Sequence, residues 1–177
     1  MNKQSSTKRL CRAGVISALY VALTYAFMPF AFGPFQIRPA EALCILPLFY
    51  IEAIPALCVG CALSNLTSPY ALFDILFGTG ATLLATLCTY VVGRFFKKDE
   101  RKLLIGGFFP VVFNAIIIPL VIVFLCGGAE GYTSQTIAYF TFFFSLFLTQ
   151  SIWVYALGSP LYFLVKRLRA RNLPLFT

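Results

Sequence analysis

Residues 103–129 read LLIGGFFPVVFNAIIIPLVIVFLCGGA, a run of 27 residues without a charged side chain. Four more charge-free runs, of 25, 21, 19 and 35 residues, cover 13–37, 53–73, 75–93 and 131–165. A run of about 18 or more apolar residues is long enough to cross the hydrocarbon core of a bilayer as a helix. The pattern therefore predicts an all-α integral membrane protein.

The composition agrees with a membrane location. Of the 177 residues, 60% are hydrophobic and 11% are charged, whereas a soluble domain carries about 25% charged residues. This excludes a disordered chain and an ordinary soluble protein, and it leaves no room for a sizeable soluble domain. We expect residues 1–177 to form a single transmembrane domain.

The positive charge is confined to short clusters. The net charge is +8, and 13 of the 14 Lys and Arg residues fall within 3–12, 94–102 and 166–171, with Arg38 the exception. Such clusters at the ends of spans are assigned to the cytoplasm by the positive-inside bias, so we interpret them as topology signals and expect no nucleic-acid partner.

Cytoplasmic clusters require an even number of spans in each interval between them. The lengths of the two intervals then predict six transmembrane helices with both termini cytoplasmic. The expected spans are 13–32, 39–51, 54–67, 72–95, 103–125 and 137–165.

The second and third spans are expected to be short. The 30 residues of 38–67 form about 45 Å of helix, whereas two full crossings need about 60 Å. Either both spans are short, or one of them stops inside the membrane. Interrupted segments of this kind often mark the binding region of a transporter.

Several kinds of chemistry are missing from the chain. There is no histidine, which removes His-based acid–base catalysis, His-activated nucleophiles and imidazole metal sites. No G-x-x-x-x-G-K-[ST] motif occurs, so an ATP-driven step would need another subunit. Cys58 and Cys61 form a C-x-x-C in an apolar setting, where packing is favoured over redox or metal binding. We expect no metal and no cofactor.

Few ionisable residues lie outside the basic clusters. A charge at the centre of a span costs about 2.5–3.5 kcal/mol, so such residues normally face a protein interior or a cavity. Glu52 falls at the inner turn of the short hairpin, where we expect it to be solvated or to contact a subunit. In the six-span topology the remaining polar residues meet near the outer leaflet: Gln36, Arg38, Glu41, Asn65 and Asp74.

Two interpretations of Arg38 and Glu41 stay open. Pro39 and Glu41 suit the first turn of a helix, so Glu41 could simply start the second span and pair with Arg38. Alternatively, a guanidinium and a carboxylate at a cavity mouth could recognise the donors and acceptors of a polar solute.

Three residues of the last two spans are polar or aromatic at mid-membrane depth. Asn114 lies between two prolines, and Gln150 and Trp153 lie three residues apart on one helix face. Hydrogen bonding between helices and ordinary packing would explain them. Equally, two amides and an aromatic ring suit a planar base that is stacked and read along its edge.

Small residues form a stripe along the first span. Its members are Gly14, Ala18, Ala22 and Ala26, spaced four apart. Such a face lets another helix approach closely, either within this protein or from a separate membrane subunit. The fourth span has a similar stripe of threonines ending at Gly93, for which we expect internal packing.

Sequence motifs give a more specific indication. Residues 32–43 read FGPFQIRPAEAL and residues 74–85 read DILFGTGATLLA, with supporting matches at 18–24 and 113–115. Over about 13–120 the chain resembles the QueT family of bacterial membrane proteins.

The resemblance implies a six-helix S component of an energy-coupling factor transporter. It implies capture of a queuosine precursor, a 7-deazaguanine such as preQ1 or queuine, at the bacterial plasma membrane. It also implies docking, through the stripe from Gly14 to Ala26, on a transmembrane coupling subunit driven by two cytoplasmic ATPases. Carried over to this chain, the residues that line or support the pocket are Gln36, Arg38, Glu41, Asn65, Asp74 and Asn114.

Other functions remain as alternatives. They are an S component for another vitamin-like solute, a stand-alone proton-coupled transporter, and a small membrane enzyme acting on lipid with Asp74 and Glu41 as acid and base. The lack of histidine and of a paired acidic metal motif argues against the enzyme, so we expect no catalytic activity.

Overall fold

The computed structural model describes residues 3–31, 36–128 and 131–171. These residues form helices and no strand. In chain order the elements are α1 (Lys3–Ala26), α2 (Met28–Ala31), η1 (Pro39–Leu48), α3 (Ala53–Asn65), α4 (Ala71–Phe73), η2 (Asp74–Gly78), α5 (Thr79–Phe95), α6 (Asp99–Leu120), η3 (Val121–Leu125), α7 (Gln135–Ala156) and α8 (Gly158–Ala170).

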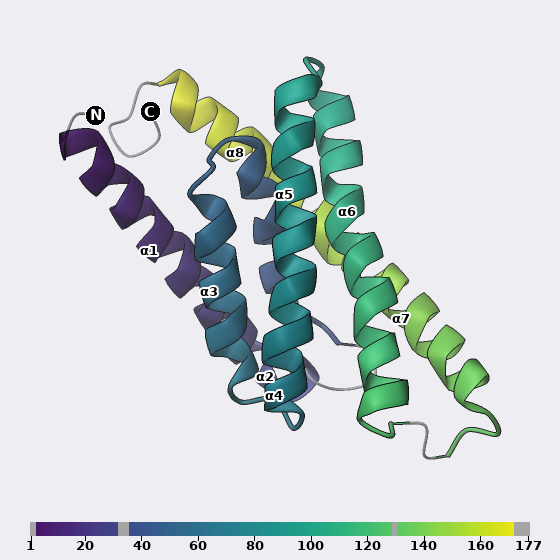
Figure 1. Ribbon diagram of the computed structural model, residues 1–177. Coiled ribbons are helices and arrows are strands. Elements are labelled where there is room, and N and C mark those ends of the chain that lie inside the picture. Colours follow the sequence, from purple (N-terminus) through teal and green to yellow (C-terminus); the bar gives the residue numbers. More distant parts are fainter. Residues whose placement is uncertain (1–2, 32–35, 129–130, 172–177) are drawn as a thin grey trace.

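Five helices stand in a row, α1, α3, α5, α6 and α7, each packed against the next (Figure 1). Helix η1 lies against this row and contacts all five of its helices as well as α8. Helix α1 begins, α8 ends and α5 turns into α6 at one end of the bundle, whereas α2 and α4 lie at the other end (Figure 1). The three basic clusters are therefore at the same end.

Among the described residues, three helices are long and apolar enough to cross a membrane: Ala71–Phe95, Asp99–Leu125 and Gln135–Ala170. They coincide with the predicted spans 72–95, 103–125 and 137–165. The π-helices η2 and η3 belong to the first two of these helices. The count of six spans and the side on which the termini lie remain predictions.

The last predicted span consists of two helices, because α7 ends at Ala156 and α8 starts at Gly158. Gly158 packs on η1: a Cβ there would lie 3.3 Å from Cδ1 of Ile45 and 3.4 Å from the carbonyl oxygen of Ala42. The absence of a side chain at Gly158 thus lets the start of α8 lie close to η1.

The second predicted span, 39–51, contains a helix that ends three residues earlier, at Leu48. Residues 39–48 form a ten-residue 3₁₀-helix whose first nine residues are buried. Pro39 starts the helix, and Pro47 has no N–H to donate within it. At about 2.0 Å per residue, η1 is about 20 Å long.

The other early elements also differ from their predicted limits. Helix α3 has 13 residues, or about 20 Å, so both members of this hairpin are short, as predicted. The first span, expected over 13–32, forms α1 and the separate short helix α2. Helix α1 begins ten residues earlier than predicted because its basic segment continues the helix beyond the apolar run.

The threonine stripe of α5 is part of the helix packing. Thr82, Thr86 and Thr89 are buried, and the Thr89 hydroxyl donates to the carbonyl oxygen of Gly106 on α6 at 2.8 Å. At Gly93 a Cβ would lie 2.9 Å from the backbone oxygen of Leu48. The predicted internal role of this stripe is confirmed.

Candidate functional site

A buried carboxylate lies at the centre of the bundle. Glu41, in the first turn of η1, is 2% exposed. The Tyr20 hydroxyl of α1 donates to its Oε1 at 2.6 Å, and the Cys44 thiol donates to its Oε2 at 3.3 Å. A carboxylate inside apolar surroundings requires such donors, because burial removes its hydration. Glu41 therefore lies in the first turn of η1, where one interpretation placed it, and also forms a polar group in the core.

Two further polar side chains are buried on the N-terminal side of Glu41. Arg38 is 5% exposed, and its Nε donates to the backbone oxygen of Ala31 at 3.0 Å. Gln36 is equally buried and has a φ of 43°. A positive φ is uncommon for a residue with a side chain, and such strained positions concentrate at functional sites. The preceding motif residues, 32–35, lie outside the described part of the chain.

An amide joins α3 to the start of the first long span. Asn65 Nδ2 donates to the backbone oxygen of Asp74 at 2.7 Å, and a Cβ at Gly78 would lie 2.9 Å from the same nitrogen. The Asp74 carboxylate accepts a hydrogen bond from the Ser68 hydroxyl. Asp74 opens the π-helix η2, and π-turns of this kind are frequent at functional sites.

Cys61 lies between these two polar groups. Its sulfur accepts from Thr82 Oγ1 at 3.4 Å and from Asn65 Nδ2 at 3.5 Å. Cys61 is fully packed in the core, which agrees with the packing role expected for the C-x-x-C. Within the described ranges no group of three His, Cys, Asp or Glu side chains could hold a metal ion.

Asn114 and Gln150 lie on the packed helices α6 and α7. Val111 and Val154 share one core cluster, and Ile118 and Leu146 share another. We therefore expect Asn114 and Gln150, which lie between these residues in the sequence, to be at a similar level. Both residues are buried: Asn114 is 5% exposed and Gln150 is 1% exposed.

Two buried amide oxygens have no hydrogen-bond partner among the residues that the structure describes. They are Oδ1 of Asn65 and Oε1 of Gln150. A buried acceptor without a donor is unfavourable by about 1–3 kcal/mol, so each is a point at which a bound molecule could donate an N–H. Trp153, one turn from Gln150, has its ring centroid 6.1 Å from that of Phe27.

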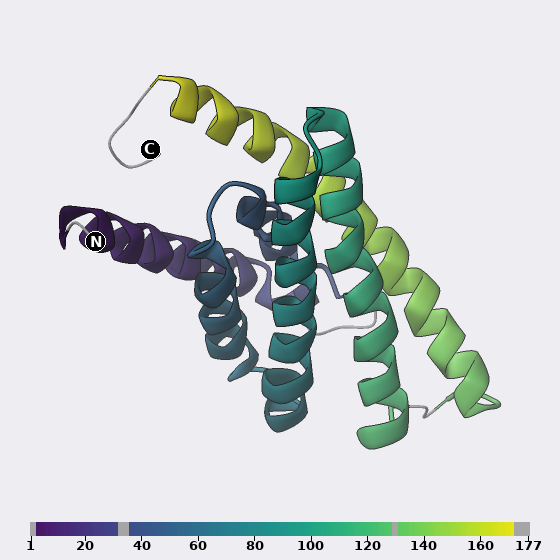
Figure 2. The ribbon, with the colours of Figure 1, turned by 45° about the horizontal axis from the view of Figure 1, so that its top comes forward.

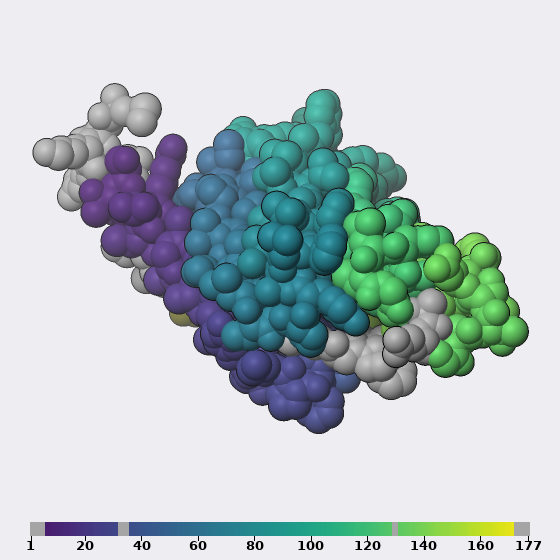
Figure 3. Space-filling model, turned by 60° about the horizontal axis from the view of Figure 1, so that its bottom comes forward, coloured from purple at the N-terminus to yellow at the C-terminus, as the bar shows by residue number. Residues whose placement is uncertain are grey.

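The structure thus brings the predicted residues into two sets. Arg38 and Glu41 lie at the start of η1 and Asn65 bonds the backbone of Asp74, whereas Asn114 and Gln150 lie on α6 and α7. Figure 3 looks onto the end of the molecule nearest to Asp74, where α2 and the start of α5 are at the surface. The sequence reasoning missed four polar partners, Tyr20, Cys61, Thr82 and Ser68, because uncharged side chains in apolar runs carry little signal.

The small-residue stripe of α1 faces outward. Gly14, Ala18, Ala22 and Ala26 are all exposed, and a Cβ at Gly14 would meet no atom within 4 Å. Between α1 and α3 lies an apolar groove of about 710 Å³ that includes the first three of them. The internal contact of α1 is made by other residues, notably Tyr20 against Gly60.

Membrane-length helices around buried charged and amide groups are typical of a membrane protein that handles a polar solute. A comparison with family models makes the class specific: the model described as QueT transporter matches residues 10–167. The chain belongs to this family, and it is a transporter protein and not an enzyme. Searches of curated proteins and of solved structures found no match.

Proposed function

We propose that the protein is the substrate-capture (S) component of an energy-coupling factor importer in the bacterial plasma membrane. It takes up a queuosine precursor, a 7-deazaguanine such as preQ1 or queuine, from the outer side. The observation that carries the proposal is the set of buried polar groups around Cys61 and between α6 and α7, which includes two amide oxygens without partners in the described structure.

The chemistry of these groups suits a guanine-like edge. Such an edge presents N–H donors and a carbonyl acceptor side by side. Glu41, Asp74 and the oxygens of Asn65 and Gln150 can accept N–H donors, whereas Arg38 or an amide nitrogen can donate to the carbonyl. A carboxylate would also pair with an aminomethyl ammonium group.

Delivery across the membrane requires partners. The chain has no phosphate-binding loop, so the proposal includes a transmembrane coupling subunit and two cytoplasmic ATPases. The exposed stripe beginning at Gly14 and the adjoining groove between α1 and α3 support docking on the coupling subunit, because small residues allow close helix approach in lipid. In this arrangement the bundle has six spans with both termini in the cytoplasm.

Calorimetry with the purified protein tests the proposal. We expect tight binding of preQ1 or queuine and no heat with flavin or thiamine; the opposite pattern would assign the protein to another solute. Uptake in cells that lack any energy-coupling module would instead indicate a stand-alone transporter.

Charge removal tests the site. Glu41→Gln or Asp74→Asn should weaken binding about 10- to 100-fold, since a hydrogen bond to a charged group contributes about 1.5–3 kcal/mol. Unchanged affinity in both variants, with the fold intact, would show that the pocket lies elsewhere.

A further inference from the structure

A second polar region lies at the opposite end of the bundle from Asp74. It is a cavity of about 620 Å³ between α1, the η1–α3 turn, α5, α6 and α8. Figure 2 shows α1 and α8 diverging on either side of this turn. We call this cavity the basic basin. Its charged lining residues are Lys8, Arg9, Arg12, Arg94, Lys102, Arg169 and Glu52.

The basic basin carries a large excess of positive charge. Six cationic side chains line it against one carboxylate, an excess of five. Arg12 Nη1 and Glu52 Oε1 lie 2.6 Å apart, so Glu52 is an ion-pair partner within this chain, and the solvated or subunit-contacting role suggested by the sequence stays a prediction. The remaining cations come from four helices, α1, α5, α6 and α8, and their mutual repulsion favours an anionic ligand between them.

Aromatic residues position three of the arginines. The guanidinium carbon of Arg12 lies 4.0 Å from the ring centroid of Tyr50. That of Arg169 lies 5.4 Å from the Tyr50 ring and 5.8 Å from the Phe49 ring. Arg94 donates to the hydroxyl of Tyr90 at 2.7 and 3.1 Å. Such contacts hold the guanidinium groups in place before a ligand arrives.

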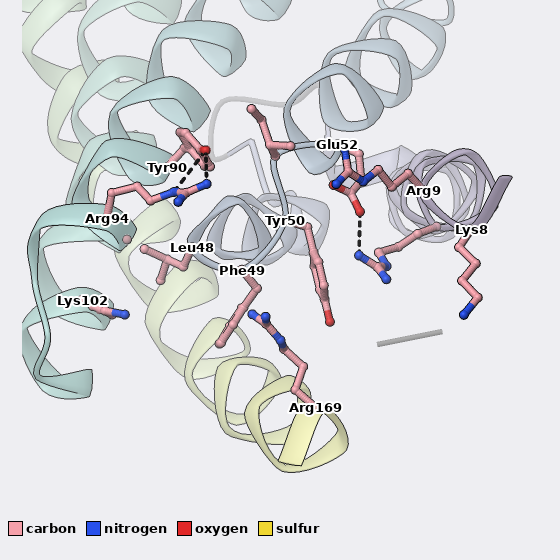
Figure 4. A pocket seen from close by; sticks show the side chains of 13 residues that line it. Lys8, Arg9, Leu48, Phe49, Tyr50, Glu52, Tyr90, Arg94, Lys102 and Arg169 are labelled. Atoms are coloured by element: carbon pink, nitrogen blue, oxygen red, sulfur yellow. Dashed lines mark hydrogen bonds and ion pairs between the residues drawn. The ribbon is translucent and has the colours of Figure 1, made fainter. Parts of the chain in front are cut away.

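The cationic side chains come from different sides of the basic basin. In Figure 4, Arg94 and Lys102 lie on one side and Lys8 on the other, with Arg169 on α8 below Tyr50. Guanidinium groups bind phosphate oxygens through paired N–H donors. A volume of about 620 Å³ falls within the range of small-molecule sites, about 300–1,000 Å³.

We propose that the basic basin binds the phosphate of an anionic phospholipid headgroup. It lies at the ends of membrane helices, at the level where headgroups of the adjacent leaflet lie. Large apolar side chains are exposed at its lining or next to it in the chain: Ile51, which lines it, is 50% exposed, and Leu10 and Phe95, which follow the lining residues Arg9 and Arg94, are 74% and 80% exposed. An acyl chain needs such apolar surface next to the phosphate, whereas an acidic peptide or a free phosphate does not. The site is separate from the proposed solute site and does not depend on the identity of the solute.

Lipid retention tests this assignment. Purified protein is taken from bilayers of equal phosphatidylglycerol and phosphatidylcholine, and the retained lipids are measured by native mass spectrometry. We expect phosphatidylglycerol to be enriched. The double variant Lys102→Gln/Arg169→Gln should reduce that enrichment about fivefold for each removed cation, until no preference remains.

A matched control separates the basic basin from general surface charge. Arg101→Gln/Arg167→Gln removes exposed cations from the same two helices, outside the basin, and should keep the enrichment within about twofold. An equal loss in both double variants, or no enrichment in the wild type, overturns the proposal. If the first variant does not fold, Arg94→Gln takes its place, with an expected fivefold loss.

Two further measurements distinguish other anions. Inorganic phosphate that raises the unfolding temperature as much as phosphatidylglycerol does would assign the basic basin to a free anion. Unchanged phosphatidylglycerol enrichment in the Lys102→Gln/Arg169→Gln variant, together with lost assembly with the coupling subunit, would assign it to an acidic protein segment. Either result overturns the lipid assignment.

Discussion

At the scale of single residues, Glu41 shows how an apolar bundle accommodates a carboxylate. Its two oxygens receive hydrogen bonds from Tyr20 and Cys44, which come from α1 and from η1 itself. These donors replace the water lost on burial. The same donors hold the carboxylate in one orientation, so a solute would meet a preorganised acceptor.

Tyr20→Phe should destabilise the protein. The substitution removes the hydroxyl that donates to Oε1 of Glu41 at 2.6 Å. Because this carboxylate oxygen then loses its donor, we expect the free energy of unfolding to fall by about 1.5–3 kcal/mol. Thermal unfolding in detergent measures this loss. Tyr25→Phe is the control, because Tyr25 is 41% exposed on the same helix; equal loss in the two variants would contradict the role given to the hydroxyl.

Gln150→Leu should separate stability from ligand affinity. Because the Gln150 oxygen has no partner in the described structure, an apolar side chain of similar size should not lower the free energy of unfolding. Affinity for a deazaguanine should fall about 3- to 10-fold, the contribution of one neutral hydrogen bond. Calorimetry and thermal unfolding on the same sample check both expectations. Unchanged affinity would exclude Gln150 from the solute site.

At the scale of elements, the contact between α1 and α3 positions the tyrosine that reaches Glu41. Gly60 provides the space: a Cβ there would lie 2.9 Å from Cβ of Tyr20 and 3.1 Å from the backbone oxygen of Ser17. Since backbone atoms are involved, a side chain at this position has to push the two helices apart.

Gly60→Ala should therefore be destabilising despite the better helix propensity of alanine. We expect a loss of about 1–3 kcal/mol from overpacking. Gly80→Ala serves as the control, since a Cβ there meets nothing within 4 Å, and it should be neutral or stabilising. Thermal unfolding of both variants tests this expectation. Equal stability of Gly60→Ala and Gly80→Ala would mean that α1 and α3 can move apart without a loss of stability, which contradicts the role given to Gly60.

At the scale of the whole molecule, the bundle has two polar ends with different compositions. The end near Asp74 has buried neutral and acidic groups together with the cation Arg38, whereas the other end has the basic basin with its excess of positive charge. A third surface, the apolar groove between α1 and α3, runs along the side. Solute binding, headgroup binding and subunit docking are thus expected at separate places. A substitution at one of these places should therefore abolish one activity and leave the other two intact.

Ala18→Leu together with Ala22→Leu should block assembly but not solute binding. Both alanines line the exposed groove, so larger side chains fill it without disturbing the core. Co-purification with the coupling subunit should be lost, while calorimetry gives wild-type affinity. Val15→Leu is the control, as Val15 is 58% exposed on α1 but outside the groove. Normal assembly of the double variant would show that the stripe is not part of the docking surface.

The three long spans could be predicted from the sequence because apolar length is a local property. The shortness of η1 and α3 could be predicted from the number of residues available between Arg38 and Thr67. The 3₁₀ conformation of η1 could not, since it depends on contacts with six other helices as well as on its prolines. The sequence also indicated Asn65 and Asp74 by residue type, but their direct hydrogen bond results from the packing of α3 on η2.

The shortness of α3 has a consequence for the surrounding lipid. Val59 and Leu63 on α3 are 52% and 45% exposed, so this helix faces outward, yet its length of about 20 Å is about 10 Å less than the hydrocarbon thickness. Such a hydrophobic mismatch is relieved by local thinning of the bilayer or by an adjoining protein. With α3 as one of the six predicted spans, a second protein that covers it would recover the free energy of that deformation, so we expect the bilayer itself to favour association at this side of the molecule.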